Sequence, residues 1–431
     1  HAGDLVLRPL ALGIATLSLS SCAASWPRDL GSHDLDKQPI ADHPRLGYLA
    51  DALDGADKAD VADLMRHRGL TWTKAPDPSQ LLQSLYDTHQ ALPPLDDDAV
   101  QLRVITYNVG LLDRPYMGTR VTVPHGEARR KAMLKALFES DANVLLLQEM
   151  WEWTHAQEFG AAAEAAGWTW YAGTEKLHLQ HGLFLAVRDQ AISGELSGEE
   201  HQFRAQRKLE HWPGPNVRRG WLHAQFQLAG TQQTVHLIDL HATSYPQFWP
   251  VRNMQARQVG LSLSELPQDD IVVLGGDLNA GPFYAEDVWI DNEGEEVAQW
   301  WLNAPAWALW QHYGDMVDAH ALSQVPADVT AGRALPTNPA QDHAQPYGSA
   351  TWCKTVAPDV FTGTECNSHY MAQYVGTEFP ARLDHILLRD RDHHVRVQQS
   401  TVVFDERHDL GADAPIEWSD HYGLRVELRV K

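Results

Sequence analysis

The sequence predicts an α/β fold in which β-sheets are covered by helices. Eight short apolar runs follow Gln101, and several are apolar at every position, as in strands that are covered on both faces. Amphipathic segments lie between these runs. Sheets covered by such helices form a layered sandwich.

Residues 1–22 predict export. They contain one arginine, an apolar run and then LSSC at 19–22, which is the charged, apolar and small-residue order of a secretory signal. LSSC resembles the lipobox of bacterial lipoproteins, and the apolar run is too short to span a bilayer. We expect an envelope-anchored lipoprotein or a secreted protein; the alternative is an incidental apolar strand or helix.

Residues 23–100 predict a tether and a small helical extension. The polar, proline-containing part to about residue 43 suits a tether, and leucines recur at helical spacing over 47–90. The sequence PPLDDDA at 93–99 marks a boundary. We therefore expect the main domain at 101–431.

The strands and helices of this domain are expected in the following order. Strands are expected at RVITYNVG (103–110), NVLLLQEM (143–150), GLFLAVR (182–188), WLHAQFQL (221–228), TVHLIDLHAT (234–243), IVVLGGDLN (271–279), LDHILLR (383–389) and YGLRVELRV (422–430). Amphipathic helices are expected at GEARRKAMLKALFES (126–140) and RNMQARQVGLSLSEL (252–266).

Polar residues recur where these strands end or begin. They are Asn108, Glu149, His241, Asp277, Asn279, Asp384, Asp420 and His421. A single acid at a strand end is usually a cap or turn residue, but strand ends of layered α/β proteins converge on one rim. Several carboxylates gathered there repel one another unless a cation is bound.

The donors in this set predict a hard cation and hydrolytic chemistry. Carboxylate and amide oxygens favour Mg²⁺, with Mn²⁺ or Ca²⁺ as alternatives. A histidine beside acids suits a base that activates water. Metal-assisted hydrolysis of a phosphate ester is the reaction that these groups serve best.

Six segments in order resemble the endonuclease/exonuclease/phosphatase superfamily, which has the deoxyribonuclease I fold. They are TYNVG, LQEMW, DLHAT, GGDLN, RLDHILL and SDHYGL, and the resemblance covers about Leu102 to Val430. It implies a four-layer sandwich of two mixed β-sheets flanked by helices. It also implies a site where the loops of the two sheets meet.

The resemblance implies a metal site and a proton-transfer site. Asn108 and Glu149 match the metal-binding pair, with Glu149 as the principal Mg²⁺ ligand, and Asp420 matches a further acid near the metal. His421 matches the general base, and Asp384 matches the carboxylate that orients it.

Three further residues match groups that contact the phosphate and the attacking water. His241 matches the histidine that donates to the phosphate, and Asp277 and Asn279 match the residues that position the water and a phosphate oxygen. We favour His421 as the proton acceptor. Whether Asp277 shares the proton or only positions the water stays open.

Within the superfamily, the motifs are most similar to those of neutral sphingomyelinases. DLHATSY, GGDLNAGP and LQEMW carry this likeness. It implies hydrolysis of sphingomyelin, or another choline phospholipid, at a membrane surface, with release of phosphocholine. We expect the protein to be a monomer. The sequence departs from the pattern at His385, where many relatives have tyrosine, and at Ile238-Asp239, where Thr-His is usual. Asp239 has no role in this interpretation.

Two other functions stay open from the sequence. A secreted Mg²⁺-dependent nuclease is disfavoured by the net charge of -23, although FRAQRKLEHWPGPNVRR at 203–219 supplies bases. A catalytically silent surface binding protein is the other alternative, but every expected site position is occupied.

Aromatic clusters and cysteines yield two further expectations. Phe248 with Trp249, or the tryptophans of 289–310, would form an interfacial lip beside the site or else pack the insertion onto the sandwich. Cys353 and Cys366 are expected to form a disulfide, with two free buried thiols as the alternative.

Overall fold

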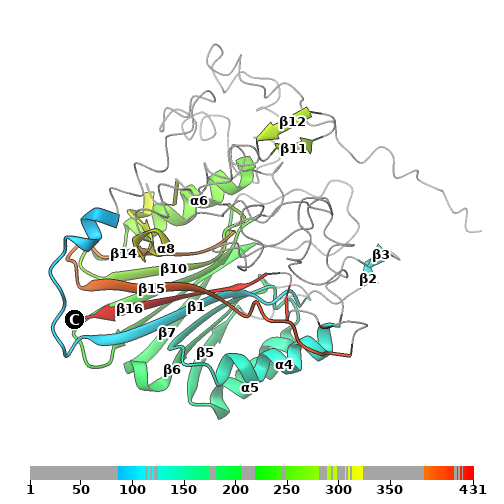
Figure 1. Ribbon diagram of the computed structural model, residues 1–431, viewed down its shortest axis with the longest axis horizontal. Coiled ribbons are helices and arrows are strands. Elements are labelled where there is room, and N and C mark those ends of the chain that lie inside the picture. The colour runs from blue at the N-terminus through cyan, green and yellow to red at the C-terminus, as the bar shows by residue number, and fades with distance from the viewer. Residues whose placement is uncertain are drawn as a thin grey trace, which may run out of the picture.

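The computed structural model (Figure 1) describes most of the predicted main domain. The described residues are 86–111, 115–116, 119–120, 125–173, 181–204, 219–243, 249–280, 289–292, 295–298, 306, 309–310, 313–323, 383–411, 415, 418–419 and 421–431. The signal and tether, all of 47–90 except a helix at 86–90, the Cys353–Cys366 pair, Phe248 and Asp420 lie outside them. Among the described residues, no helix combines the length and hydropathy that crossing a membrane requires.

Two six-stranded mixed sheets form the centre of the structure. The first contains β1 (Val100–Asn108), β4 (Val144–Gln148), β5 (Trp168–Ala172), β6 (Phe184–Arg188), β15 (Val395–Val403) and β16 (Gly423–Val430), in the order β15-β16-β1-β4-β6-β5. The second contains β7 (Ile192–Gln202), β8 (Gly220–Leu228), β9 (Thr234–His241), β10 (Ile271–Asp277), β13 (Val317–Asp318) and β14 (Asp384–Arg389), in the order β13-β14-β10-β9-β8-β7. Strands β1 and β4 pair in parallel, as do β9 and β10, and the remaining pairs are antiparallel.

Helices cover the outer faces of the two sheets, which confirms the predicted four-layer sandwich. Helices α4 (Gly126–Phe138) and α5 (Trp153–Ala165) lie against the first sheet, and α6 (Trp249–Ser264) and α8 (Ala319–Ser323) lie on the side of the second (Figure 1). The remaining elements are a short 3₁₀ turn, η3 (Asp189–Ala191), and two hairpins, β2 (Pro115–Tyr116) with β3 (Thr119–Arg120) and β11 (Trp289–Asn292) with β12 (Glu295–Ala298).

All eight predicted strands and both predicted helices are present. Within the two six-stranded sheets, the strands that the prediction missed are the four edge strands β5, β7, β13 and β15. An edge strand needs no continuous apolar run, because one side of it has no neighbouring strand. Strand β7 shows this most clearly, since its sequence ISGELSGEEHQ is mostly polar and partly exposed.

The core between the sheets is built from alternating positions of each strand. On β1, Leu102 and Val104 face the second sheet, whereas Ile105 and Tyr107 face α4 and α5. The same period of two applies on the other strands, because successive side chains of a strand point to opposite faces. The inward-facing rows of β1, β9 and β10 are apolar along most of their length and end in Asn108, His241 and Asp277.

Two glycines of β10 let a side chain and a backbone approach β10 closely just below this polar end. A Cβ atom at Gly275 would overlap Leu146 of the facing sheet, and one at Gly276 would overlap the backbone carbonyl of Leu240. Gly276 also has a φ of 149°, which L-residues rarely adopt. The paired glycines therefore bring β9, β10 and the first sheet together beside the site.

Gly276→Ala is expected to destabilise the fold strongly. The methyl group would meet a backbone oxygen that cannot move without shifting β9, and overpacking of this kind costs about 1–3 kcal/mol beyond the cost of the unusual φ. Gly194→Ala is the matched control, because Gly194 also has a positive φ but has open space around its Cβ position. Urea unfolding of both variants measures the difference, and equal losses would contradict the proposed overlap.

Candidate active site

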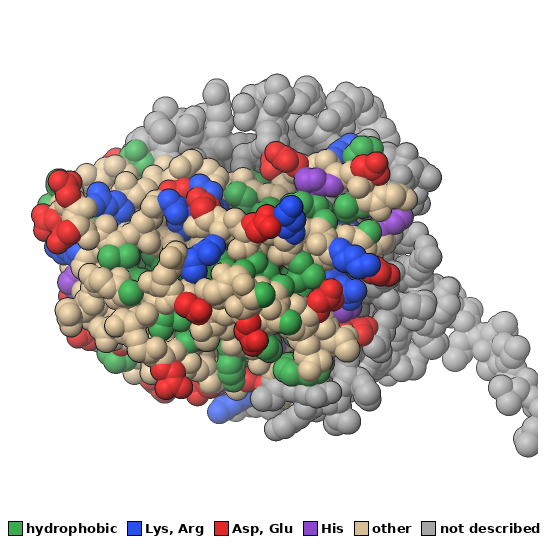
Figure 2. All heavy atoms as spheres, turned by 90° about the horizontal axis from the view of Figure 1, so that it is seen from below, with side chains coloured by type: hydrophobic (Ala, Val, Ile, Leu, Met, Phe, Trp, Pro, Cys, Tyr) green, Lys and Arg blue, Asp and Glu red, His purple; other side chains and the backbone are tan. Residues whose placement is uncertain are grey.

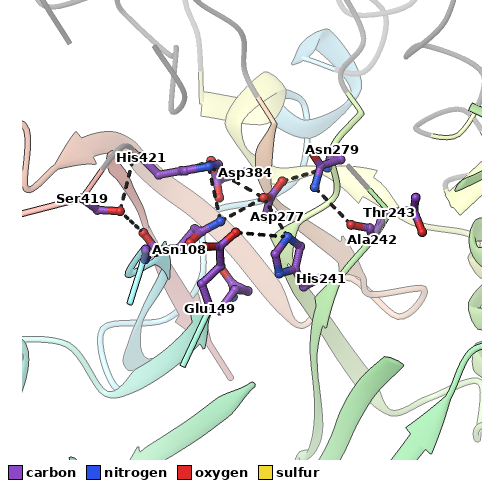
Figure 3. Close-up of polar contacts among 12 residues, drawn as sticks. Asn108, Glu149, His241, Ala242, Thr243, Asp277, Asn279, Asp384, Ser419 and His421 are labelled. Carbon is purple, nitrogen blue, oxygen red and sulfur yellow. Dashed lines mark hydrogen bonds and ion pairs between the residues drawn. The ribbon is translucent and has the colours of Figure 1, made fainter. Parts of the chain in front are cut away.

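The predicted site residues meet at one end of the layer between the two sheets (Figure 3). The strand registers place them there. Asp277 at the end of β10 is paired with His241 of β9 and with Asp384 at the start of β14. Asn108 at the end of β1 is paired with Gln148, which precedes Glu149. The prediction that these strand ends converge is confirmed for every described member of the set.

His421 is held by Asp384 in a buried pair. Nδ1 of His421 lies 2.8 Å from Oδ2 of Asp384, which is completely buried. An ionised carboxylate only accepts hydrogen bonds, so Nδ1 donates and Nε2 keeps its lone pair. Nε2 faces the amide nitrogen of Asn108 at 3.3 Å and Oδ2 of Asp277 at 3.8 Å. This geometry leaves Nε2 as a base directed into the site.

Asp277 contacts four other residues of the site, Asn108, Asn279, His241 and His421. Its Oδ2 accepts a hydrogen bond from Nδ2 of Asn108 at 3.0 Å, and its Oδ1 accepts one from the backbone N–H of Asn279 at 2.9 Å. Burial raises the pKa of Asp277, but attraction to the protonated form of His421 and the contacts with His241 and Asn279 outweigh it and hold this pKa well below its ordinary value. Asp277 is therefore a carboxylate at neutral pH.

His241 presents an N–H group to the two acids. Its Nε2 lies 3.2 Å from Oδ2 of Asp277 and 3.8 Å from Oε1 of Glu149. Burial lowers the pKa of His241, as does the nearby charge of Arg219, while Asp277 and Glu149 act in the opposite direction. The ring also packs against Trp151, with centroids 5.8 Å apart, and the Arg219 guanidinium lies 5.2 Å from the centroid of Trp151. A neutral His241 can donate a hydrogen bond to a phosphate oxygen.

Two site residues have left-handed backbone conformations. Glu149 has a φ of 64° and Asn279 a φ of 46°. Asparagine adopts this region readily, whereas a left-handed backbone conformation costs about 1–2 kcal/mol at glutamate. Strain of this kind persists where the surrounding structure imposes it, and it is common at functional sites. Nδ2 of Asn279 donates to the backbone oxygen of Ala242 at 3.1 Å, which fixes the turn after β10 against the end of β9.

Three positioning residues of this site were not predicted from the sequence. The hydroxyl of Ser419 donates to the backbone oxygen of Asn108 at 2.6 Å and lies 3.3 Å from the backbone nitrogen of His421. The buried guanidinium of Arg129 on α4 donates to Gly110 at 2.7 Å and to Trp418 at 2.6 Å. Serine in the SDH motif was a usable signal. Nothing in the helical sequence around Arg129 distinguishes it from its neighbours.

His385, which follows Asp384 on β14, is the third of these residues. Its Nε2 donates to the backbone oxygen of Ala280 at 2.8 Å, and its Nδ1 lies 3.3 Å from Oδ2 of Asp318. The histidine is completely buried. It therefore anchors the turn that carries Asp277 and Asn279 from the far side of the sheet.

The donor set fits a hard divalent cation. Among the described residues, the Glu149 carboxylate has an ion-pair contact with Nε2 of His241 at 3.8 Å, and its side chain is 20% exposed. Asp277, Asp384 and His421 bring ligand atoms within 4.8 Å of one another. Oδ1 of Asn108 accepts a hydrogen bond from Gly110 at 3.1 Å and has a second lone pair for a cation. The predicted ligand Asp420 lies outside the described residues.

A second polar layer lies directly beneath the site. Nε2 of Gln148 donates to Oδ1 of Asp239 at 2.7 Å and lies 3.2 Å from Oγ1 of Thr106, so these side chains link the two sheets. Asp239 is fully buried, and burial raises its pKa well above the ordinary value even though the hydrogen bond from Gln148 lowers it. Oε1 of Gln148 is a buried oxygen without a donor in the described structure. A protonated Asp239 supplies a donor that the carboxylate lacks.

Asp239→Asn is expected to be increasingly more stable than the wild type as the pH rises from about 4. The folded protein holds the Asp239 proton, whereas the unfolded chain releases it near its ordinary pKa of about 3.9. The wild type therefore loses about 1.4 kcal/mol of stability per pH unit from that point up to the folded-state pKa, and asparagine has no such loss. Urea unfolding of both proteins at pH 4, 5, 6 and 7 measures the difference. A difference that does not change with pH would mean that Asp239 is ionised in the fold.

Residues 105–421 match the model of the Endonuclease/Exonuclease/phosphatase family. No curated protein sequence matches significantly.

Solved structures that resemble this fold include the following three, given with their sequence identity, the share of each chain that is covered and the TM-score. TDP2 from D. rerio in complex with a single-strand DNA product is 19% identical, covers 76% of this chain and 98% of its own, and has a TM-score of 0.49. Sphingomyelinase C from Streptomyces griseocarneus is 19% identical, covers 77% and 100%, and has a TM-score of 0.46. A variant of Staphylococcus aureus beta toxin with bound magnesium ions is 14% identical, covers 77% and 100%, and has a TM-score of 0.48.

Proposed function

Because the chain belongs to the Endonuclease/Exonuclease/phosphatase family, we propose that it is a Mg²⁺-dependent phosphodiesterase that hydrolyses sphingomyelin to ceramide and phosphocholine. The family is hydrolytic and of phosphodiesterase type, and its members depend on divalent metal ions. One observation carries the chemical part of the proposal. The His421–Asp384 pair directs a base toward an ionised Asp277, at the point where Glu149 and His241 converge.

Each residue on this side of the site has its own role in hydrolysis. Nε2 of His421 takes a proton from the attacking water, and Asp384 stabilises the imidazolium that forms. Asp277 accepts a hydrogen bond from the same water and places it. Because its pKa is held far below the ordinary value, Asp277 keeps a proton poorly at neutral pH, which favours His421 as the proton acceptor.

The opposite side of the site binds the phosphate. His241 donates from Nε2 to a phosphate oxygen, and Asn279 lies beside it, held by Ala242. Arg219 contributes positive charge behind Trp151. These groups stabilise negative charge that increases on the phosphate oxygens as the water attacks.

Glu149 and Asn108 would hold the metal ion, with Asp420 as a further ligand. Mg²⁺ is the proposed ion, with Mn²⁺ or Ca²⁺ as alternatives, because the ligands are carboxylate and amide oxygens. Bound there, the ion supplies Lewis-acid stabilisation of the phosphate charge.

The lipid part of the proposal is supported by sequence features. The motifs DLHATSY, GGDLNAGP and LQEMW resemble those of neutral sphingomyelinases, and the signal-like segment at 1–22 fits an exported enzyme, lipid-anchored or secreted. Phe248 and Trp249 follow His241 closely in the sequence and are candidates for an interfacial lip that docks on a membrane surface. We propose that the enzyme acts as a monomer.

A panel of phosphodiesters tests the substrate class. Sphingomyelin, phosphatidylcholine, lysolipid, DNA and inositol phosphates are each incubated with the protein and Mg²⁺. Phosphocholine release from sphingomyelin vesicles that stops in EDTA and in His421→Ala supports the proposal. Rapid hydrolysis of DNA with no lipid turnover would replace it with a nuclease, and no turnover of any substrate with intact Mg²⁺ binding would favour a surface binding protein.

The nuclease is the second candidate because of Arg219. This cation adjoins the site and ends the basic stretch 203–219. On the face shown in Figure 2, however, the Lys and Arg side chains described there are interspersed with Asp and Glu and form no continuous basic surface. The net charge of -23 also disfavours a polyphosphate backbone as partner.

A further inference from the structure

A second cluster of titratable side chains lies on the second sheet, away from the active site. Glu199 and His201 are two residues apart on the edge strand β7, so their side chains point to the same face. His223 of β8 is directly opposite Glu199 in the strand register. His223 is paired with Ile238 of β9, three positions before His241. The cluster therefore lies on the opposite face of the sheet from His241.

Three potential ligand atoms converge in this cluster. Oε1 of Glu199 lies 3.0 Å from Nε2 of His201 and 3.1 Å from Nδ1 of His223. All three atoms lie within 4.8 Å of one another. In a tetrahedral zinc site with bonds of about 2.0–2.1 Å, ligand atoms are separated by about 3.3 Å. Nε2 of His201 is buried but is not in line for a hydrogen bond with the carboxylate.

Further residues orient the two imidazoles of the cluster. Nε2 of His223 lies 2.9 Å from Nδ1 of His236, and Nε2 of His236 lies 2.8 Å from Oδ2 of Asp270. The ring of His201 stacks on Trp221 at 4.7 Å between centroids. Metal-binding histidines are commonly oriented in this way, with the second ring nitrogen bound to another polar group and finally to a carboxylate.

The series of side-chain contacts from Glu199 to Asp270 has one proton fewer than it needs. It contains three contacts, Glu199 to His223, His223 to His236 and His236 to Asp270, and each needs a proton between its two atoms. Two neutral imidazoles carry only two N–H protons, and the two carboxylates carry none. One contact would therefore join two lone pairs unless an additional proton or a metal ion is bound.

The geometry of the cluster favours a metal ion over an additional proton. A proton would bridge only two of the atoms, whereas the structure brings a third, Nε2 of His201, to the same carboxylate oxygen.

We propose that Glu199, His201 and His223 bind a zinc-class divalent ion that ties the edge strand β7 to β8. Two imidazole nitrogens and one carboxylate oxygen suit Zn²⁺, whereas Mg²⁺ prefers oxygen ligands. The Glu199 side chain is 61% exposed, so the ion can enter from solvent and water can complete its coordination. The proposal is independent of the substrate of the active site.

Zinc titration of the metal-free full chain tests the proposal. Calorimetry with ZnCl₂ is performed in excess Mg²⁺, which occupies the hard-cation site around Glu149. The wild type is expected to bind one Zn²⁺ that the double variant His201→Ala/His223→Ala does not bind. Asp270→Asn should weaken binding about 10–100-fold, as removal of an orienting carboxylate does. X-ray absorption of the zinc-loaded wild type should show two imidazole ligands.

Gln225→Ala is the matched control, because Gln225 lies on the same face of β8 two residues from His223 and is exposed. It should leave zinc binding unchanged. If the double variant does not fold, the single variant His201→Ala on the edge strand carries the same test. No zinc binding by the wild type, or equal binding by wild type and variants, would overturn the proposal and mean that the cluster holds a proton only.

Discussion

Replacing His421 with alanine is expected to reduce kcat by about 10²–10⁴-fold, the usual contribution of a general base. Nε2 of His421 is the basic atom that the Asp384 pair directs into the site, at 3.8 Å from Asp277. Asp277 cannot take over this role, because its pKa is held well below the ordinary value. Steady-state hydrolysis of the preferred substrate from the phosphodiester panel measures the loss.

Asp384 supplies a sharper test of the same mechanism. In Asp384→Asn, the amide can donate to Nδ1 of His421, which moves the proton to Nε2 and removes the basic atom. Asp384→Asn should therefore impair kcat, and adding it to His421→Ala should cause little further loss, because the two residues act as one unit. Losses that multiply in the double variant would show that Asp384 acts independently of His421, and near wild-type kcat in His421→Ala would reject it as the base.

Glu149→Gln is expected to weaken activation by Mg²⁺ by more than the 10–100-fold that loss of an orienting outer residue costs. The substitution keeps the shape of the side chain and removes its charge, and a single amide oxygen is a poorer ligand for a hard cation than a carboxylate. Activity measured over a range of Mg²⁺ concentrations, together with calorimetric Mg²⁺ binding, gives the shift. Glu139→Gln, at an exposed acid at the end of α4, is the control and should bind Mg²⁺ as the wild type does.

The metal-free stability of Glu149→Gln separates a ligand from a structural acid. Removing one charge from a group of carboxylates relieves repulsion, so the melting temperature without metal should stay the same or rise. A large fall in this temperature would instead mean that Glu149 holds the fold together.

The sequence predicted the central strands well because strands that are buried on both faces have an almost wholly apolar composition. Strands such as β4 and β10 are covered on both faces, so an apolar side chain is required at every position until the chain reaches the site. The edge strands β5, β7, β13 and β15 lack that requirement, and helix α5 lies in the alanine-rich segment WTHAQEFGAAAEA, where the apolar period is weak. These elements were found only in the structure.

The candidate site was predicted as a set of residues but not as an arrangement. Ser419 and Arg129 act on the site through backbone carbonyls, and a backbone partner leaves no signature in the sequence. Asp239 stands in a strand pattern that predicts an apolar side chain, and its role depends on Gln148, which lies 91 residues away in the chain. The second cluster was not predicted either, since Glu199 and His223 meet only when β7 and β8 pair.

By itself, the sequence determined the class of fold and the chemistry of the site, because burial selects apolar residues and the strand ends carry donors with a definite affinity for hard cations. Only the tertiary structure decided which of these groups is the base and which stays ionised. Protonation depends on burial and on charges a few ångströms away, and in this protein those neighbours come from strands far apart in the sequence. His421 and Asp384 are 37 residues apart, and Asn108 and Asp277 are 169 apart, yet each pair shares a buried hydrogen bond.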